Sequence, residues 1–218
     1  MSYKPDLCIY HGNCADGFGA AWAIHERWPD CEFHPGAYGA APPDCTGKHV
    51  LLVDFSYKYD VLCLISFKAR STVVIDHHKT AQADLERLPP FTGGMDSLDF
   101  AFKLNWTQNT PEIAVWFDLE QSGATMAWKF ANDMNENPPR LLEYVQDRDL
   151  WRFDLEGSRE VAAVVFSHPY DFDAWHDLVV RAQADDDLGE MIREGAAIER
   201  KHHKDVAELL KVTARPMT

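Results

Sequence analysis

The sequence lacks any apolar run long enough to cross a membrane. A spanning helix needs about 20 consecutive apolar residues, and no stretch of the 218-residue chain approaches that length. The opening residues, MSYKPDLCIYHGN, also lack the long apolar core of a secretory signal. We therefore expect a cytoplasmic protein that does not enter membranes.

Cysteines and basic residues are also few. The five cysteines are odd in number and form no CxxC pair, which disfavours a disulfide framework or a zinc ribbon and predicts reduced, buried thiols. Lys and Arg number 21 against 35 Asp and Glu, a formal net charge of −14. Because clustered basic residues supply most affinity for a phosphate backbone, we exclude a long nucleic acid duplex as partner. Small phosphorylated substrates and short oligonucleotides fit better.

Hydrophobic residues, in contrast, make up 46% of the chain, enough for one substantial core. Short apolar segments alternate with helical patterns, which is typical of a parallel sheet covered on both faces. The sequence predicts an α/β fold with a central parallel β-sheet flanked by helices and a helical C-terminal segment. We expect a main domain over residues 1–170 and a helical linker segment over residues 171–218.

Individual elements follow from the same patterns. Strands are predicted at 7–11, 31–34, 50–55, 72–75 and 113–117, and helices at 20–28, 58–67, 123–132, 141–151, 175–184 and 188–212. Ser122 is the expected cap of the helix that begins at Gly123. Residues 89–109, rich in Gly, Asp and Asn, predict a loop before the strand at 113–117.

Three of the predicted strands end in acidic or imidazole side chains. The residues are His11 with Asp16 just beyond, Asp54, and the run Asp76, His77, His78. Because the carboxyl ends of parallel strands meet at one edge, we expect these groups to converge. A set of carboxylates and imidazoles with few basic neighbours requires cations, and it suits Mn²⁺, or else Mg²⁺ or Fe²⁺. A carboxylate shared by two ions would suit phosphoester hydrolysis.

Four segments resemble, in order, the motifs of the DHH phosphoesterase superfamily. They are HGNCADGFGAAWA, VDFS, VIDHHK and YVQDRDLW, within residues 7–152. This superfamily includes RecJ exonucleases, nano-RNases, cyclic-dinucleotide phosphodiesterases and family II inorganic pyrophosphatases. The form of the first motif is more similar to the nano-RNase and nucleotide phosphodiesterase branch.

The resemblance implies a set of metal ligands. Asp16, Asp54, His77 and Asp147 would bind one ion, and Asp54 would bridge to a second ion that His11 also binds. Asp149 is the rival of Asp147. Residues two apart on a helix point in different directions, and we favour Asp147.

The resemblance also implies catalytic and substrate-binding residues. Asp76 would support a histidine from behind, and His78 would lie near the substrate phosphate. Asn13 and Gly17 are further candidates for contact with the substrate. Cys14 stands where the family usually places a carboxylate, so it is an alternative ligand, and a thiolate there would favour Zn²⁺ or Fe²⁺. We expect two ions with unequal affinity.

These features predict a metal-dependent phosphoesterase that hydrolyses a phosphodiester, in a short oligonucleotide or a cyclic or linear nucleotide, through metal-activated water. The alternatives are a phosphoanhydride hydrolase and a non-catalytic nucleotide-binding or regulatory module of the same fold. Residues 188–218 match no C-terminal substrate-binding domain of the superfamily. Either the sequence is a fragment, or the catalytic domain and a partner subunit hold the substrate together, for which a homodimer is the expected form. His202 and His203 are predicted on a solvated helix face.

Overall fold

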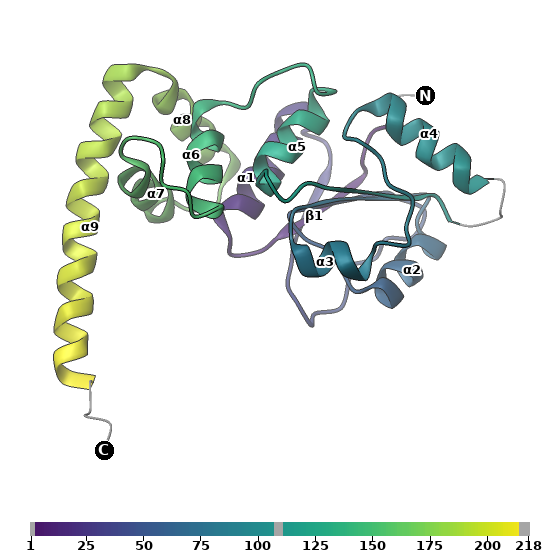
Figure 1. The fold of residues 1–218 in the computed structure, drawn as a ribbon, viewed down its shortest axis with the longest axis horizontal. Helices are drawn as coiled ribbons and strands as arrows, with labels where there is room; N and C mark the ends of the chain where they lie inside the picture. The colour runs from purple at the N-terminus through teal and green to yellow at the C-terminus, as the bar shows by residue number, and fades with distance from the viewer. Residues whose placement is uncertain (1–2, 107–110, 214–218) are drawn as a thin grey trace.

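The computed structural model describes residues 3–106 and 111–213 (Figure 1). Its centre is a five-stranded sheet of order β2-β1-β3-β4-β5, in which every neighbouring pair is parallel. The strands are β1 Leu7–His11, β2 Glu32–Gly36, β3 His49–Val53, β4 Ser71–Asp76 and β5 Ile113–Phe117. The predicted α/β class with a parallel sheet is confirmed.

Helices cover this sheet, and the described chain after residue 140 is entirely helices and their connections. They are α1 Ala15–Arg27, α2 Tyr59–Lys68, α3 Lys79–Asp84, α4 Met95–Trp106, α5 Gly123–Ala131, α6 Arg140–Asp149, α7 Ser158–Ser167, α8 Phe172–Gln183 and α9 Asp185–Thr213. Ser122 caps α5 as predicted, because its side chain accepts from the amide of Thr125. The six predicted helices are all present, whereas α3, α7 and α4 were not foreseen.

Helix α4 corrects the prediction of a loop over residues 89–109, of which residues 107–109 lie outside the described part. The signal for its start is distant in sequence: the Asp133 carboxylate accepts from the amide of Met95 at 2.8 Å. Its inner face then buries Leu98 and Ala101 in the core. A cap supplied from 38 residues away leaves no local pattern, so single-sequence reasoning misses the helix.

Alternate residues of the inner strands enter different cores, as a parallel sheet covered on both faces requires. In β3, Leu51 and Val53 face the core on the α1 and α5 side, while Val50 and Leu52 face the core on the α2 side. Helices α1 and α5 also pack on each other. Helices therefore cover both faces of the sheet. Side chains from several strands can still meet at the carboxyl ends of the strands.

The strand order places a topological switch point at that edge. β1 lies between β2 and β3, and α1 leaves β1 toward one face whereas α2 leaves β3 toward the other. Such a reversal of direction opens the space outside the carboxyl ends of the two central strands, where α/β proteins bind ligands. The predicted metal ligands His11 and Asp16 lie at or just after the end of β1, and Asp54 directly follows β3.

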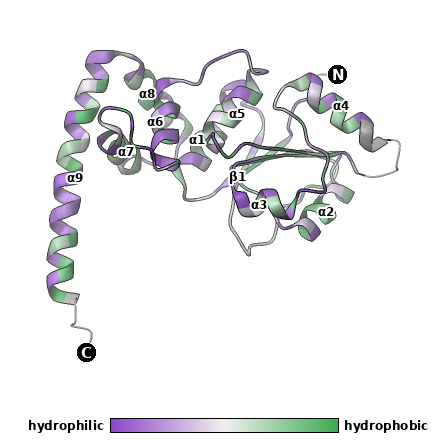
Figure 2. Ribbon diagram, viewed as in Figure 1, coloured by the Kyte–Doolittle hydropathy of each residue, from purple (hydrophilic) through white to green (hydrophobic). Residues whose placement is uncertain are grey.

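Helices α6 to α9 form a further layer beyond α1 and α5 (Figure 1). Trp175 of α8 is fully buried in the core that α1 and α5 share. The helix that follows the expected domain boundary at residue 170 therefore packs against the main domain. Residues 201–212 of α9 are exposed and project from the body with mixed hydropathy (Figure 2). His202 and His203 are exposed, as predicted. In the described ranges, no helix combines the length and apolarity that a bilayer crossing demands.

All five cysteines are free, and Cys8, Cys31 and Cys45 are buried. This agrees with the prediction of reduced thiols that fill the core.

The packing of α9 on α7 depends on Gly195. A Cβ at this position would lie 1.9 Å from the carbonyl oxygen of Glu160, whereas a Cβ at Gly189 of the same helix would have only the Arg193 guanidinium nearby, at 3.6 Å. We expect Gly195→Ala to lower the free energy of unfolding by about 1–3 kcal/mol through overpacking. Gly189→Ala should leave it unchanged or raise it by up to about 1 kcal/mol, because alanine favours helix. Urea unfolding of both variants measures the difference, and equal midpoints would contradict this packing.

Candidate metal centre

Seven acidic and imidazole side chains gather where β1, β3 and β4 end. The set is His11, Asp16, Asp54, Asp76, His77, His78 and Asp149. Six of them form two groups whose ligand atoms lie within 4.8 Å of one another: His11, Asp54 and His78, and Asp16, His77 and Asp149. The structure thus has partly buried clusters of Asp and His that could hold a metal ion.

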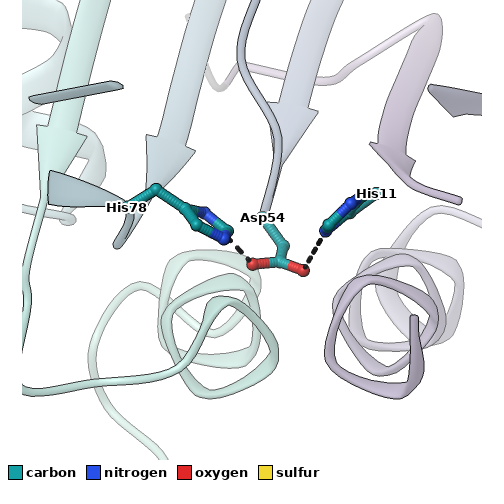
Figure 3. Close-up of side chains that lie close together, drawn as sticks. All are labelled: His11, Asp54 and His78. Carbon is teal, nitrogen blue, oxygen red and sulfur yellow. Dashed lines mark ion pairs between the residues drawn. The ribbon is translucent and has the colours of Figure 1, made fainter. Parts of the chain in front are cut away.

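Asp54 lies between the two groups. Its Oδ2 is 3.5 Å from Nδ1 of His11, while its Oδ1 is 3.1 Å from Nε2 of His77 and 3.9 Å from Nδ1 of His78. Figure 3 shows His11 and His78 on opposite sides of this carboxylate, just past the end of β3. Both oxygens of one buried carboxylate therefore face imidazoles from different strands.

The backbone of Asp54 is strained in a way that supports a functional position. Its φ is 54°, a left-handed conformation that costs a non-glycine residue about 1–3 kcal/mol and persists only when its surroundings impose it. Gly123 at the start of α5 leaves the necessary room, because a Cβ there would lie 2.4 Å from Cβ of Asp54. Strand end and helix start are thus fitted to one another around this carboxylate.

His77 forms the centre of the second group. Its Nε2 lies 3.1 Å from an oxygen of Asp54 and 3.5 Å from oxygens of Asp16 and Asp149. Two ligand atoms about 2.1 Å from a shared ion stand about 3.0 Å apart in octahedral and about 3.4 Å apart in tetrahedral coordination. The spacing of these side chains therefore fits ligands of one divalent cation.

Asp16 is held in place by the first turn of α5. Its carboxylate accepts from the amides of Gly123 at 2.7 Å and Ala124 at 3.0 Å, at the helix end where the dipole favours negative charge. Sequence reasoning missed these two amides. The available signal was the Ser122-Gly123 helix start shortly after β5, whose carboxyl end lies on the same edge of the sheet.

The electrostatics of the site are those of crowded negative charge. Contact with Asp54, with a further contribution from Cys14, raises the pKa of His11 to about 10. Burial lowers the pKa of His77, but its contact with Asp54 and the charge of Asp16 outweigh this and raise it to about 9. Burial and the neighbouring carboxylates raise the pKa of Asp16. Protons on the histidines thus offset charge that a cation would otherwise neutralise.

Asp76 is fully buried and orients the histidine pair that follows it. Its Oδ1 accepts from the amides of His77 at 2.7 Å and His78 at 3.1 Å and lies 2.7 Å from Nδ1 of His78. Contact with Asp76 raises the pKa of His78. A carboxylate that holds one ring nitrogen in this way fixes the ring orientation and directs the other nitrogen outward.

The structure gives Asp147 and Asp149 different surroundings. The Asp147 carboxylate accepts from the amides of Asp154 at 2.9 Å and Leu155 at 3.2 Å, whereas Asp149 lies 3.5 Å from His77. Helix α6 ends at Asp149, so the chain turns back and presents its amides to Asp147. The geometry therefore favours Asp149 over Asp147 as the ligand beside His77. Asp147 positions the loop that follows α6.

Three further candidates lie on the turn from β1 into α1. Cys14 is the N-cap residue of α1 and is partly exposed. Asn13 is exposed and adopts a φ of 56°. Gly17 is buried, and a Cβ there would lie 2.2 Å from the carbonyl oxygen of His11. The lack of a side chain at Gly17 is explained by this tight turn, and contacts of Asn13 and Gly17 with substrate stay predictions.

The two aspartates of α6 should separate in solution. We expect Asp149→Asn to weaken Mn²⁺ binding by about tenfold or more, with little change in stability. Asp147→Asn should lower the free energy of unfolding by about 1.5–3 kcal/mol, because a charged acceptor of two amides is lost. It should reduce the affinity for Mn²⁺ less than Asp149→Asn does. Calorimetric titration and urea unfolding provide both readouts. Equal losses of Mn²⁺ affinity in the two variants would contradict this assignment.

The raised pKa values of His11 and His77 predict that rising pH destabilises the protein without metal and strengthens its binding of a metal ion. In the unfolded chain these groups titrate near 6.5, whereas in the fold they titrate at about 10 and 9. Their stabilisation is complete below the unfolded value and is lost as pH rises through the folded values. A metal ion competes with the same protons, so its affinity rises with pH.

Thermal unfolding from pH 7 to pH 9, with and without Mn²⁺ under nitrogen, tests this expectation. The metal-free Tm should fall and the increment from Mn²⁺ should widen. Parallel curves would show that these histidines do not exchange protons for the ion.

No family model matches the chain. Over 196 residues it is 28% identical to an uncharacterised protein of Acanthamoeba polyphaga mimivirus, a match that covers 79% of this chain and 39% of the viral protein. Its fold is similar to the crystal structure of an uncharacterised protein from Helicobacter pylori, with a TM-score of 0.56, 10% identity, and coverage of 88% of this chain and 61% of that one. The chain thus spans less than two thirds of either relative, and the structural likeness shows the fold alone.

Proposed function

We propose that this chain is a metal-dependent phosphoesterase of the DHH type, which hydrolyses a phosphodiester in a short oligonucleotide or a nucleotide. The observation that carries the proposal is the position of Asp54, with one oxygen toward His11 and the other toward His77. A carboxylate shared by two groups of ligands is the arrangement that a pair of divalent ions needs.

The proposed roles follow from these contacts. Asp16, His77 and Asp149 would hold one ion, His11 would hold the other, and Asp54 would bridge them. Ions such as Mn²⁺, Mg²⁺, Fe²⁺ or Zn²⁺ would supply an activated water and neutralise charge on the phosphoryl oxygens. The oxygen-rich and imidazole ligands favour Mn²⁺ among these.

His78 is proposed to face the phosphate. Its side chain is 35% exposed, compared with 24% for His11 and 11% for His77, so it is the most accessible of the three imidazoles. Because Asp76 holds its Nδ1, its Nε2 is left to meet a phosphoryl oxygen. Asp76 then acts as a positioning residue for this contact.

The two groups differ in charge, which supports unequal affinities. Three carboxylates surround His77, whereas the carboxylate beside His11 is Asp54. Cys14 lies close enough to raise the pKa of His11 further, after the larger effect of Asp54. We propose that the ion near His77 binds tightly and the ion near His11 weakly, with Cys14 as the alternative soft ligand.

Hydrolysis of bis-p-nitrophenyl phosphate with added Mn²⁺ tests the proposal. Asp54→Asn should reduce the rate by about a hundredfold or more, because the shared ligand is lost, while Asn tolerates the left-handed backbone. His203→Ala, on the exposed part of α9, should stay within about twofold. No Mn²⁺-dependent turnover by the wild type, combined with retained nucleotide binding, would favour the non-catalytic module. A rate unaffected by Asp54→Asn would remove the bridging role.

A further inference from the structure

The loop between β2 and β3 places an exposed aromatic ring beside the metal ligands. Tyr38 is 63% exposed, and its ring centroid lies 5.4 Å from that of His11, edge to face at 66°. An aromatic ring that is open to solvent on one face can accept a planar ligand group by stacking. Tyr38 follows β2 by two residues and so lies at the same edge of the sheet as His11.

The Tyr38 ring rests on a buried support. Its centroid is 5.1 Å from that of Phe55, which is fully buried and follows Asp54 directly. Phe55 fits there because position 36 is a glycine, where a Cβ would lie 2.8 Å from the Phe55 ring. The ring of Tyr38 is thus set against Phe55 and His11 and keeps its remaining surface in solvent.

The order of side chains along the edge matches the parts of a nucleotide. Tyr38 contacts His11, and His11 contacts Asp54, the carboxylate proposed to bridge the ions. A phosphate held near Asp54 would leave room for a sugar beside His11 and for a planar base at Tyr38. Stacking of a base on an aromatic ring needs no positive charge and tolerates any base. That property suits a chain whose formal net charge is −14.

We propose that Tyr38 is the stacking platform for the nucleobase of the substrate, so that the site takes nucleoside phosphates in preference to phosphate esters without a planar group. This proposal rests on the proposed phosphate site at the metal centre. Tyr38 lies outside the four segments that resemble the superfamily motifs.

The test compares binding of AMP and ribose 5-phosphate, which share the sugar and the phosphate and differ by the base. With Mn²⁺ present, calorimetry should show that the wild type binds AMP about tenfold more tightly, the size expected for one stacked base. Tyr38→Ala should remove this preference, and Tyr38→Phe should keep it. Phe67→Ala truncates another aromatic side chain, 74% exposed near the end of α2, and should leave the preference unchanged.

Equal affinity of the wild type for AMP and ribose 5-phosphate would overturn the proposal. So would a preference that survives Tyr38→Ala, or no detectable binding of AMP. The binding measurement needs no turnover, so its outcome does not depend on whether the protein hydrolyses a phosphodiester. If AMP is preferred through Tyr38 but no phosphodiester is cleaved, the stacking platform stands and the phosphoesterase activity does not.

Discussion

Asp54 connects the ends of the three central strands. Its carboxylate is buried, and each of its oxygens has an imidazole nearby. Burying a charge is costly unless it is paired, and here His11 comes from β1 and His77 follows β4. Burial alone would raise the pKa of Asp54, but its contacts with these two histidines hold that pKa below its ordinary value. The left-handed backbone at Asp54 and the missing side chain at Gly123 are both conditions for this contact.

Helix α5 has a related and less obvious part in the site. The first amides of a helix commonly bind a phosphate, but in α5 the amides of Gly123 and Ala124 are occupied by Asp16. This contact joins residues 107 and 108 positions apart and fixes α1 against α5 at the edge of the sheet. Because these amides already bind a protein carboxylate, they are not free to bind a phosphate, and under the proposed function that attraction would come from metal ions and His78.

The sequence allowed the three central strands, β1, β3 and β4, to be predicted well because they are short, largely apolar and mostly buried, so that each ends visibly at a polar residue. The convergence of His11, Asp54 and His77 follows from that pattern and from the parallel direction of the strands. Asp147 and Asp149 could not be told apart, since the answer depends on where α6 ends and on amides that follow it. Tyr38 was overlooked because its environment is assembled from Gly36, Phe55 and His11 through tertiary contacts that have no local pattern.

The acidic centre also shows how protons can offset crowded negative charge at a place where a metal ion could bind. The carboxylates of Asp16, Asp54 and Asp149 all lie within 3.5 Å of Nε2 of His77, and three such charges would repel one another strongly in a partly buried space. A proton on His77, and another on His11, offsets part of this repulsion at neutral pH, as their raised pKa values indicate. A divalent ion would take over the role of these protons without moving the side chains far, because the ligand spacing is already close to that of coordination. The site is therefore organised by the fold itself, and metal binding would exchange protons for an ion within an arrangement that already exists.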